Sequence, residues 1–226
     1  MKQNNIILDL DNTLYAYDVP HKAAMNTVYD EFHRLYDLNR KAAESVFTLA
    51  RKQTHLELPS QAASHNRLLY FQKMLERIEG ASLHHGLYFY DCYWDTFLNH
   101  LVLDEGVMEW LEMVKAKGGR ICLLTDLTAH IQYRKLKRLK LTEILDFMVS
   151  SEEVGIEKPH PYMFTRALQK LNCNSTEALM IGDSWEKDIE GAMAMNIRAV
   201  WLNRNAEKRN VPAVVKEIRS FIEIQL

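Results

Sequence analysis

Short apolar runs that end in polar residues recur along the chain and predict a parallel β-sheet. The first run, residues 6–8, leads directly into a segment that carries Asp9 and Asp11. Short continuous apolar runs are typical of strands that are buried on both faces of a parallel sheet. Further runs of this kind occupy residues 121–124, 147–149, 178–181 and 199–202.

Segments with helical periodicity alternate with these strands from Asp104 onward. Their apolar residues repeat every three or four positions, as Val107, Leu111 and Val114 do in the first of them. Strands that alternate with helices form right-handed βαβ units, in which helices cover both faces of the sheet. The predicted fold class is therefore α/β, a Rossmann-like parallel sheet core with helices on both faces. The helices are predicted at residues 107–117, 129–140, 161–171, 185–195 and 214–224.

A long helical segment interrupts this alternation after the first strand. A βα unit usually returns to its sheet within about 30 residues, but here the chain leaves after Leu14 and returns only near Ile121. The apolar periodicity between them predicts an inserted α-helical cap of four or so helices over residues 16–101. The α/β core then consists of residues 1–15 and 102–226. An insertion at the active edge of a sheet can serve as a lid.

Composition excludes several classes of partner. The chain has 226 residues, a net charge of -2 and 47% hydrophobic residues, so it lacks the broad basic field that gathers nucleic acid. No apolar run approaches the ~18 residues that a membrane span needs. The three cysteines form no CxxC pair, and the first residues lack the apolar region of a signal peptide. We expect a cytoplasmic monomer or small homo-oligomer with reduced thiols.

The polar residues at the strand ends resemble, in type and order, the motifs of the haloacid-dehalogenase-like (HAD) hydrolase superfamily. Its first motif, DxDx(T/V), matches residues 9–13, and its second, an apolar strand that ends in Thr or Ser, matches Thr125. The third motif, a Lys, matches Lys158, and the fourth, GDxxxxD, matches residues 182–188. The resemblance covers essentially the whole chain. A helical cap between the first two motifs occurs in one large branch of the superfamily.

The acidic residues in these motifs predict a metal site. Asp9, Asp11 and Asp183 would converge at neighbouring strand ends, where two carboxylates ~4 Å apart repel by roughly 4 kcal/mol at an effective dielectric near 20. A cation would relieve this repulsion. Oxygen ligands without His or Cys favour a hard ion, and Mg2+ binds phosphate oxygens readily. The resemblance implies that the ligands of Mg2+ are the Asp9 carboxylate, the main-chain carbonyl of Asp11, and Asp183.

The resemblance also implies a catalytic role for three side chains. Asp9 attacks phosphorus and forms an aspartyl-phosphate. Asp11 protonates the leaving oxygen and then activates the water that hydrolyses the intermediate. Lys158 balances the negative charge of Asp9 and of the group in transfer, which is the main electrostatic demand of phosphoryl transfer.

Three further residues are candidates for substrate binding or support. The Thr125 hydroxyl and the main-chain N–H of Asp126 would bind phosphoryl oxygens, although both residues could instead cap the following helix. Asp126 stands where relatives commonly carry Asn. Asp188 would orient Lys158 or a metal-bound water.

Other polar groups have simpler interpretations. The basic residues of the helix at 129–140 are predicted to form a solvated face rather than a site for an acidic partner. Four histidines lack the spacing of zinc ligands and are interpreted as residues of the cap surface. Four residues that follow the first motif are candidates for substrate contacts. The basic residues are Arg134, Lys135, Lys137, Arg138 and Lys140. The histidines are His55, His65, His84 and His85. The candidates for substrate contacts are Tyr15, Tyr17, His21 and Lys22.

The predicted function is that of a Mg2+-dependent phosphatase for a small phosphorylated metabolite, a sugar phosphate or a nucleotide. A dehalogenase of the same superfamily needs no metal and usually lacks the second acid, so Asp11 argues against it. A phosphonatase, with Lys22 as a Schiff-base residue, or a phosphomutase stays open, because the cap determines that outcome. A catalytically silent phosphate-binding protein is the alternative from another class, and it would not need both Asp9 and Asp11.

Overall fold

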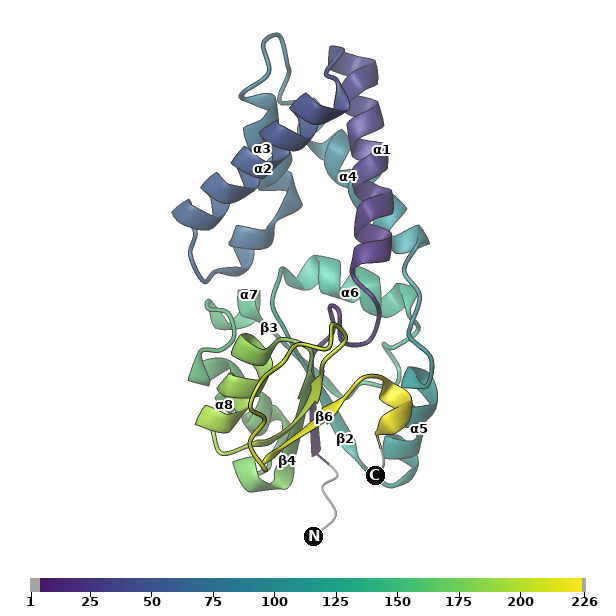
Figure 1. Ribbon diagram of the computed structural model, residues 1–226, viewed down its shortest axis with the longest axis vertical. Helices are drawn as coiled ribbons and strands as arrows, with labels where there is room; N and C mark the ends of the chain where they lie inside the picture. The colour runs from purple at the N-terminus through teal and green to yellow at the C-terminus, as the bar shows by residue number, and fades with distance from the viewer. Residues whose placement is uncertain (1–4, 225–226) are drawn as a thin grey trace. The chain divides into compact units, whose positions relative to one another are not determined.

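The computed structural model describes residues 5–224 (Figure 1). Contacts between residues divide the chain into two compact units. One unit contains the residues up to Ala16 together with those from Val102 onward, and the other is Tyr17–Leu101. The first unit holds every strand of the sheet, and the second is helical.

The first unit is built on a parallel sheet of six strands in the order β3-β2-β1-β4-β5-β6. The first strand of the chain, β1, lies in the interior of the sheet between β2 and β4. This order places the end of β1 beside the ends of the two strands that carry the second and fourth motifs. The strands are β1 Asn5–Leu8, β2 Arg120–Thr125, β3 Phe147–Ser150, β4 Ala178–Gly182, β5 Arg198–Leu202 and β6 Val215–Ile218.

The interior strands are apolar because both of their faces are covered. Ile6, Ile7 and Leu8 have no exposed surface. Successive side chains of a strand point to opposite faces, and Ile7 packs in one cluster with Cys122 and Met180 of the neighbouring strands. Figure 1 shows helices on opposite sides of the sheet, with α8 on one side and α5 on the other. The predicted α/β fold with a sheet covered on both faces is confirmed.

The helices of this unit follow the predicted segments closely. The predicted helix at 185–195 is divided, because the π-helical turn Trp185–Ile189 precedes the short helix α9. Short 3-10 turns lie at Ser175–Glu177 and Phe221–Glu223. The α-helices are α5 Val107–Ala116, α6 Ala129–Arg138, α7 Ser151–Val154, α8 Pro161–Leu171 and α9 Glu190–Ala194.

The prediction of a closing helix over residues 214–224 is wrong. This segment forms strand β6, which pairs with β5 in parallel, and then the 3-10 turn. Val214, Ile218 and Ile222 have helical spacing, but Val214 and Ile222 are 54% and 62% exposed. The buried residues are instead Val215 and Ile218, and two exposed or half-buried positions separate them. Pairing with the edge of the sheet thus prevails over the weak helical pattern.

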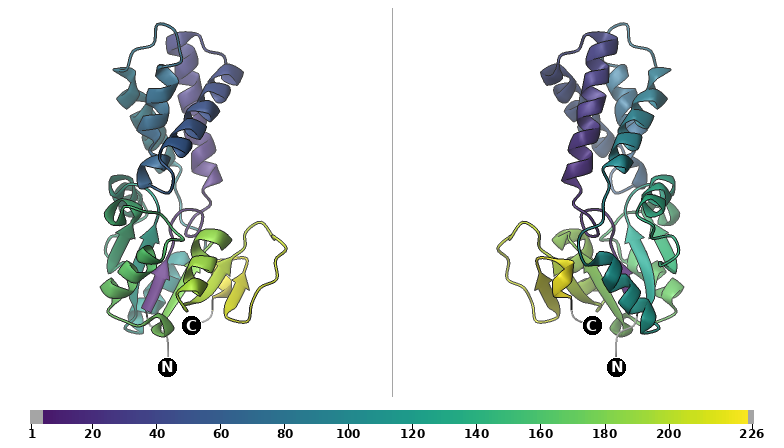
Figure 2. Two further views of the ribbon diagram at one scale, coloured as in Figure 1. Left: turned by 90° about the vertical axis from the view of Figure 1, so that its left-hand side faces the viewer. Right: turned by 90° about the vertical axis from the view of Figure 1, so that its right-hand side faces the viewer.

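The second unit consists of helices (Figure 2). Aromatic side chains pack between them. The rings of Phe32 and Phe89 stack with centroids 3.8 Å apart and tie α1 to α4. The third helix of the unit, α3, begins after Asn66, whose extended backbone separates it from the 3-10 turn Ala62–His65. The Asn66 side chain accepts a hydrogen bond from the N–H of Leu68. The α-helices are α1 Asp18–Tyr36, α2 Arg40–Glu57, α3 Arg67–Leu75 and α4 His85–Asn99.

None of the helices in the described part of the chain combines the length and the apolar character that a membrane crossing requires.

Candidate active site

The site lies at the carboxyl ends of β1, β2 and β4, which are neighbours in the sheet. Ligands of open α/β sheets bind outside these ends of the strands. Asp9 directly follows β1, Thr125 is the last residue of β2, and Asp183 directly follows β4. The sheet therefore brings Asp9 together with two residues that are each more than 100 positions from it in the sequence.

Asp9 is buried and both of its carboxylate oxygens have partners. Its Oδ1 accepts a hydrogen bond from Lys158 Nζ at 2.6 Å, and its Oδ2 accepts one from the Thr13 hydroxyl at 2.7 Å. The N–H of Asp9 donates to the carbonyl of Ile181 at 3.0 Å, which fixes the backbone against β4. Burial, with a smaller contribution from the repulsion of Asp188, outweighs the attraction of Lys158 and raises the pKa of Asp9 to about 7.

Lys158 lies between two carboxylates. Its ammonium donates to Asp9 Oδ1, to Asp188 Oδ1 at 2.7 Å and to the carbonyl of Leu124 at 3.0 Å. Burial acts to lower the pKa of Lys158, but Asp188 and Asp9 together raise it well above its usual range, so the side chain stays charged. The second oxygen of Asp188 accepts a hydrogen bond from the N–H of Ser184. Asp188 therefore lies where it can hold Lys158 against Asp9.

Two residues of the first motif hold Asp183 beside Asp9. The Asn12 amide donates to Asp183 Oδ2 at 2.6 Å. The Thr13 hydroxyl lies 2.7 Å from Asp9 Oδ2 and 3.3 Å from Asp183 Oδ1, and it accepts from the N–H of Asp183. Burial and the nearby charge of Asp9 raise the pKa of Asp183 to about 6.

The chemistry of this cluster fits a divalent cation. Within residues 5–224, Asp9, Asp183 and Asp188 form a group whose nearest carboxylate oxygens all lie within 4.8 Å of one another. Lys158 neutralises one of these three charges, so two remain when all the acids are ionised. Burial, together with repulsion between neighbouring carboxylates, raises the pKa values of Asp9 and Asp183. Hard oxygen donors with surplus negative charge are the surroundings that Mg2+ prefers.

Asp11 is paired with the helix that follows β2. Its Oδ1 accepts hydrogen bonds from Lys135 Nζ at 2.5 Å and from the Tyr15 hydroxyl, and its Oδ2 accepts one from Gln132 Nε2 at 3.0 Å. Burial acts to raise the pKa of Asp11, but Lys135 and the hydrogen bonds outweigh it and hold that pKa below its usual range. Lys135 is 1% exposed. The prediction that this residue belongs to a solvated face is wrong, because helix α6 turns it toward the strand ends.

Thr125 and Asp126 do not cap the next helix. The Thr125 hydroxyl accepts a hydrogen bond from Gln132 Nε2 at 2.6 Å. The Asp126 carboxylate accepts from the N–H of Lys158 at 3.0 Å and from Lys187 Nζ at 2.7 Å. The negative charge of Asp126 is therefore paired with Lys187, and this carboxylate also holds the backbone of Lys158.

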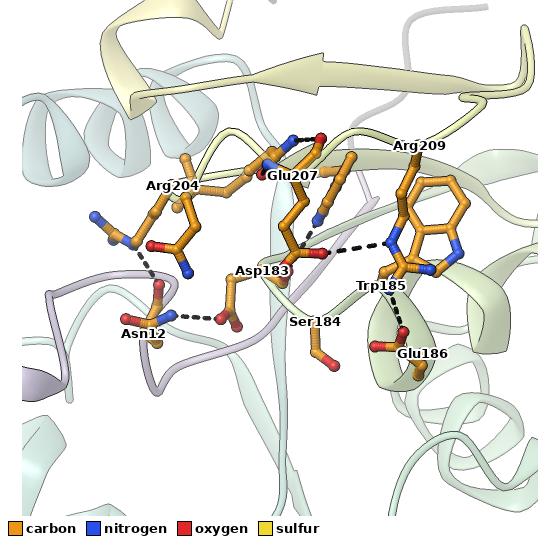
Figure 3. Close-up of a pocket in the computed structure, with 12 residues that line it drawn as sticks. Asn12, Asp183, Ser184, Trp185, Glu186, Arg204, Glu207 and Arg209 are labelled. Atoms are coloured by element: carbon orange, nitrogen blue, oxygen red, sulfur yellow. Dashed lines mark hydrogen bonds and ion pairs between the residues drawn. The ribbon is translucent and has the colours of Figure 1, made fainter.

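A polar pocket of about 390 Å³ lies on the Asp183 side of the cluster (Figure 3). Arg204 lines it and donates to the carbonyl of Asn12 at 2.6 Å and to that of Thr13 at 2.9 Å, while it also pairs with Asp104. Arg204 thus fixes the loop that presents Asn12 and Thr13 to the acids. At the other end of the pocket Arg209 pairs with Glu186, so its charge is already compensated.

The chain belongs to the haloacid dehalogenase-like hydrolase family, whose model matches residues 6–202. It is similar to the ribulose-1,5-bisphosphate 5-phosphatase of Halopiger xanaduensis, with 35% identity over 204 residues that cover 89% of this chain and 85% of that relative. It is also similar to the glyceraldehyde 3-phosphate phosphatase of Pyrococcus abyssi, with 32% identity over 109 residues that cover 48% of this chain and 46% of that relative.

The fold is shared with solved structures of the same family. The crystal structure of an HAD phosphatase from Thermococcus onnurineus superposes with a TM-score of 0.78 and covers 97% of this chain and 95% of its own, at 23% identity. The predicted family is confirmed, and with it the prediction that the chain is an enzyme of the HAD-like hydrolase class. The roles of individual site residues stay predictions.

Sequence reasoning missed several residues that support the acids. Lys135 and Gln132 lie three positions apart, which places them on one face of α6, but their helix also carries four other basic residues within the predicted segment. Arg204 lies beyond the fifth strand in a segment without a recognisable motif. Tyr15, a candidate for substrate contact, is fully buried and donates to Asp11 instead.

Gly182 provides a test of the packing beneath the cluster. A Cβ atom at this position would lie 2.3 Å from Asp188 Oδ2, and so Gly182→Ala must displace the carboxylate that holds Lys158. We expect the substitution to lower the free energy of unfolding by about 1–3 kcal/mol, as overpacking does. Urea unfolding measures this change.

Gly86→Ala is the matched control, because a Cβ there meets its nearest neighbour at 3.8 Å, an ordinary contact. Gly86 is helical, and Ala favours helices over Gly by about 1 kcal/mol. This variant should unfold at the wild-type urea concentration or above it. Equal midpoints for Gly182→Ala and wild type would contradict the close approach of Asp188.

The raised pKa values predict how metal binding depends on pH. In the metal-free fold, the pKa of Asp9 is about 7 and that of Asp183 about 6, both above the ordinary value of 3.8. The folded state then binds more protons than the unfolded state, so the contribution of these groups to stability falls as pH rises from about 4 to 7. Mg2+ competes with those protons and should raise the Tm more at about pH 8 than at about pH 5.

Differential scanning calorimetry with and without Mg2+ measures this difference. Asp183→Asn should remove most of the metal-dependent rise in Tm at the higher pH, since it removes one of the charges. A rise that is the same at both pH values, or that survives in Asp183→Asn, would contradict the assignment of these carboxylates.

Proposed function

We propose that this protein is a Mg2+-dependent phosphatase that hydrolyses a small phosphorylated metabolite through an aspartyl-phosphate on Asp9. The observation that carries the proposal is the setting of Asp9, whose buried carboxylate lies at the end of β1 between Lys158 and Thr13. The family membership supports it, because phosphatases are among the named relatives. Both of those named relatives act on phosphorylated sugars, so this class is the first to test and nucleotides the second.

In the proposed first step, an Asp9 oxygen attacks phosphorus and the bond to the leaving oxygen breaks. Lys158 offsets the negative charge of the attacking carboxylate and of the phosphoryl group, and its pairing with Asp188 keeps it in place before substrate arrives. Preorganised charge of this kind supplies much of the rate enhancement in phosphoryl transfer. Mg2+ bound by Asp9, Asp183 and the carbonyl of Asp11 would supply further positive charge at the phosphoryl oxygens.

In the proposed second step, the Asp11 carboxylate takes a proton from water as that water attacks phosphorus. The bond between phosphorus and the Asp9 oxygen breaks, which restores Asp9 and releases phosphate. In the first step a protonated Asp11 gives its proton to the leaving oxygen, and the carboxylate that forms, which the lowered pKa of Asp11 favours, is the base of the second step. Thr125 and the N–H of Asp126 would bind phosphoryl oxygens during both steps.

The alternatives are less well supported. A dehalogenase would not need the second acid, and the Asp11 carboxylate is held in place by three donors. A phosphonatase would need a desolvated Schiff-base lysine, whereas the Lys22 side chain is 75% exposed and pairs with Asp18. We retain the predictions that residues 16–101 act as the cap and that the enzyme is cytoplasmic, a monomer or small homo-oligomer.

The first test is hydrolysis of p-nitrophenyl phosphate by wild type with Mg2+, by wild type with EDTA, and by Asp9→Asn with Mg2+. We expect rapid turnover only in the first condition. The rate should fall by roughly 10³-fold or more in the other two, because EDTA removes Mg2+ and Asp9→Asn removes the nucleophile. A panel of sugar phosphates and nucleotides then ranks substrates by kcat/KM. Metal-dependent turnover by Asp9→Asn at the wild-type rate would refute the proposed nucleophile.

Lys158 is predicted to act on the transition state rather than on ground-state binding. Lys158→Ala should lower kcat by about 100-fold or more and leave KM within a few-fold of wild type. Lys208→Ala is the control, since Lys208 lies on an exposed loop, and its kinetics should match wild type. A rise in KM at unchanged kcat would argue that Lys158 only binds substrate.

A further inference from the structure

Helix α6 presents two polar side chains to the site that the proposed reaction does not use directly. Lys135 is 1% exposed and Gln132 is fully buried, whereas Lys137 and Arg138 of the same helix are exposed. Both buried side chains end at the carboxylate of Asp11. Apolar residues of α6, Ile131 among them, share the buried part of the helix surface.

We propose that Lys135 and Gln132 are positioning residues that hold the Asp11 carboxylate in the orientation in which it activates water. The inference rests on the proposed phosphatase function and deepens it, because it names what fixes the second acid. Neither residue is assigned contact with substrate.

The hydrogen bonds leave a defined oxygen of Asp11 for chemistry. Oδ1 is occupied by two donors, Lys135 Nζ and the Tyr15 hydroxyl. Within residues 5–224, Oδ2 accepts one hydrogen bond, from the side-chain amide of Gln132 at 3.0 Å. A carboxylate oxygen has two acceptor positions, so Oδ2 keeps one for the proton of the attacking water.

Gln132 also joins Asp11 to the strand end where the phosphoryl group is proposed to bind. Its Nε2 lies 2.6 Å from the Thr125 hydroxyl and 2.9 Å from the carbonyl of Asp126, as well as 3.0 Å from Asp11 Oδ2. One amide nitrogen therefore fixes the distance between the base and the proposed phosphoryl ligands.

Stability alone does not account for this ion pair. Removal of the Lys135 and Asp11 charges from water has a cost that their mutual attraction often fails to offset. Apolar residues of similar size would fill the same space without that cost. A role in aligning a base explains why a charged pair stands here.

The step that depends on this alignment is hydrolysis of the aspartyl-phosphate. Water attacks phosphorus, Asp11 Oδ2 takes one of its protons, and the bond from phosphorus to the Asp9 oxygen breaks as phosphate leaves. Formation of the intermediate from p-nitrophenyl phosphate does not need Asp11, because p-nitrophenolate leaves without a proton. Loss of alignment should thus slow the second step and spare the first.

The experiment is pre-steady-state and steady-state hydrolysis of p-nitrophenyl phosphate with Mg2+ by Lys135→Met. We expect kcat to fall by about 10- to 100-fold, which is less than the full rate enhancement by a general base because Asp11 itself is still present. The value of kcat/KM should stay within about threefold of wild type. A burst of p-nitrophenol should appear, and acid-quenched protein should carry a phosphoryl group. Asp11→Asn should show the same pattern, and the double variant should be no slower than Asp11→Asn.

Lys137→Met on the exposed side of α6 is the matched control and should behave as wild type. Gln132→Met provides a second test if Lys135→Met does not fold, with the same expected burst. Equal losses in kcat and kcat/KM without a burst, or effects that add to those of Asp11→Asn, would overturn the inference and leave the phosphatase intact. Absence of turnover by wild type would overturn the phosphatase proposal itself, and the inference with it.

Discussion

The carboxylates of Asp9 and Asp188 share the buried ammonium of Lys158, and the carboxylate of Asp183 lies close to both. The rest of the site depends on this surplus of negative charge. Burial and the repulsion of Asp188 raise the pKa of Asp9 despite the attraction of Lys158. The fold tolerates the surplus negative charge because hydrogen bonds from other groups hold each carboxylate in place. We propose that a divalent cation bound at these carboxylates offsets the surplus negative charge.

The supporting hydrogen bonds come from segments that are distant in the sequence. Arg204 holds the loop of the first motif, and Gln132 of α6 joins Asp11 to the end of β2. Asp126 is paired with Lys187 and accepts from the backbone of Lys158. Each acid is therefore fixed by at least one group outside its own motif, so that the geometry exists before a substrate binds. Such preorganisation lowers the cost of reaching the transition state.

The sequence predicted those features that local pattern determines. Buried strands are apolar on both faces, so the runs that end at Asp9 and Thr125 could be recognised, and their parallel order placed the two ends together. The prediction of a closing helix failed because Val214, Ile218 and Ile222 have helical spacing, whereas pairing with the edge of the sheet buries Val215 instead. The prediction that Lys135 is solvated failed for a similar reason. The predicted helix carries five Lys and Arg residues, and only tertiary packing decides which of them is buried.

The central claim is that Asp9 is the nucleophile, and chemical trapping tests it most directly. Wild-type protein would be mixed with p-nitrophenyl phosphate and Mg2+, quenched during turnover, reduced with borohydride and digested for mass spectrometry. An acyl phosphate is reduced to an alcohol, so the account predicts homoserine at position 9 and an unmodified peptide without substrate. Steady turnover with Asp9 unmodified, or with the label on another carboxylate, would contradict the account.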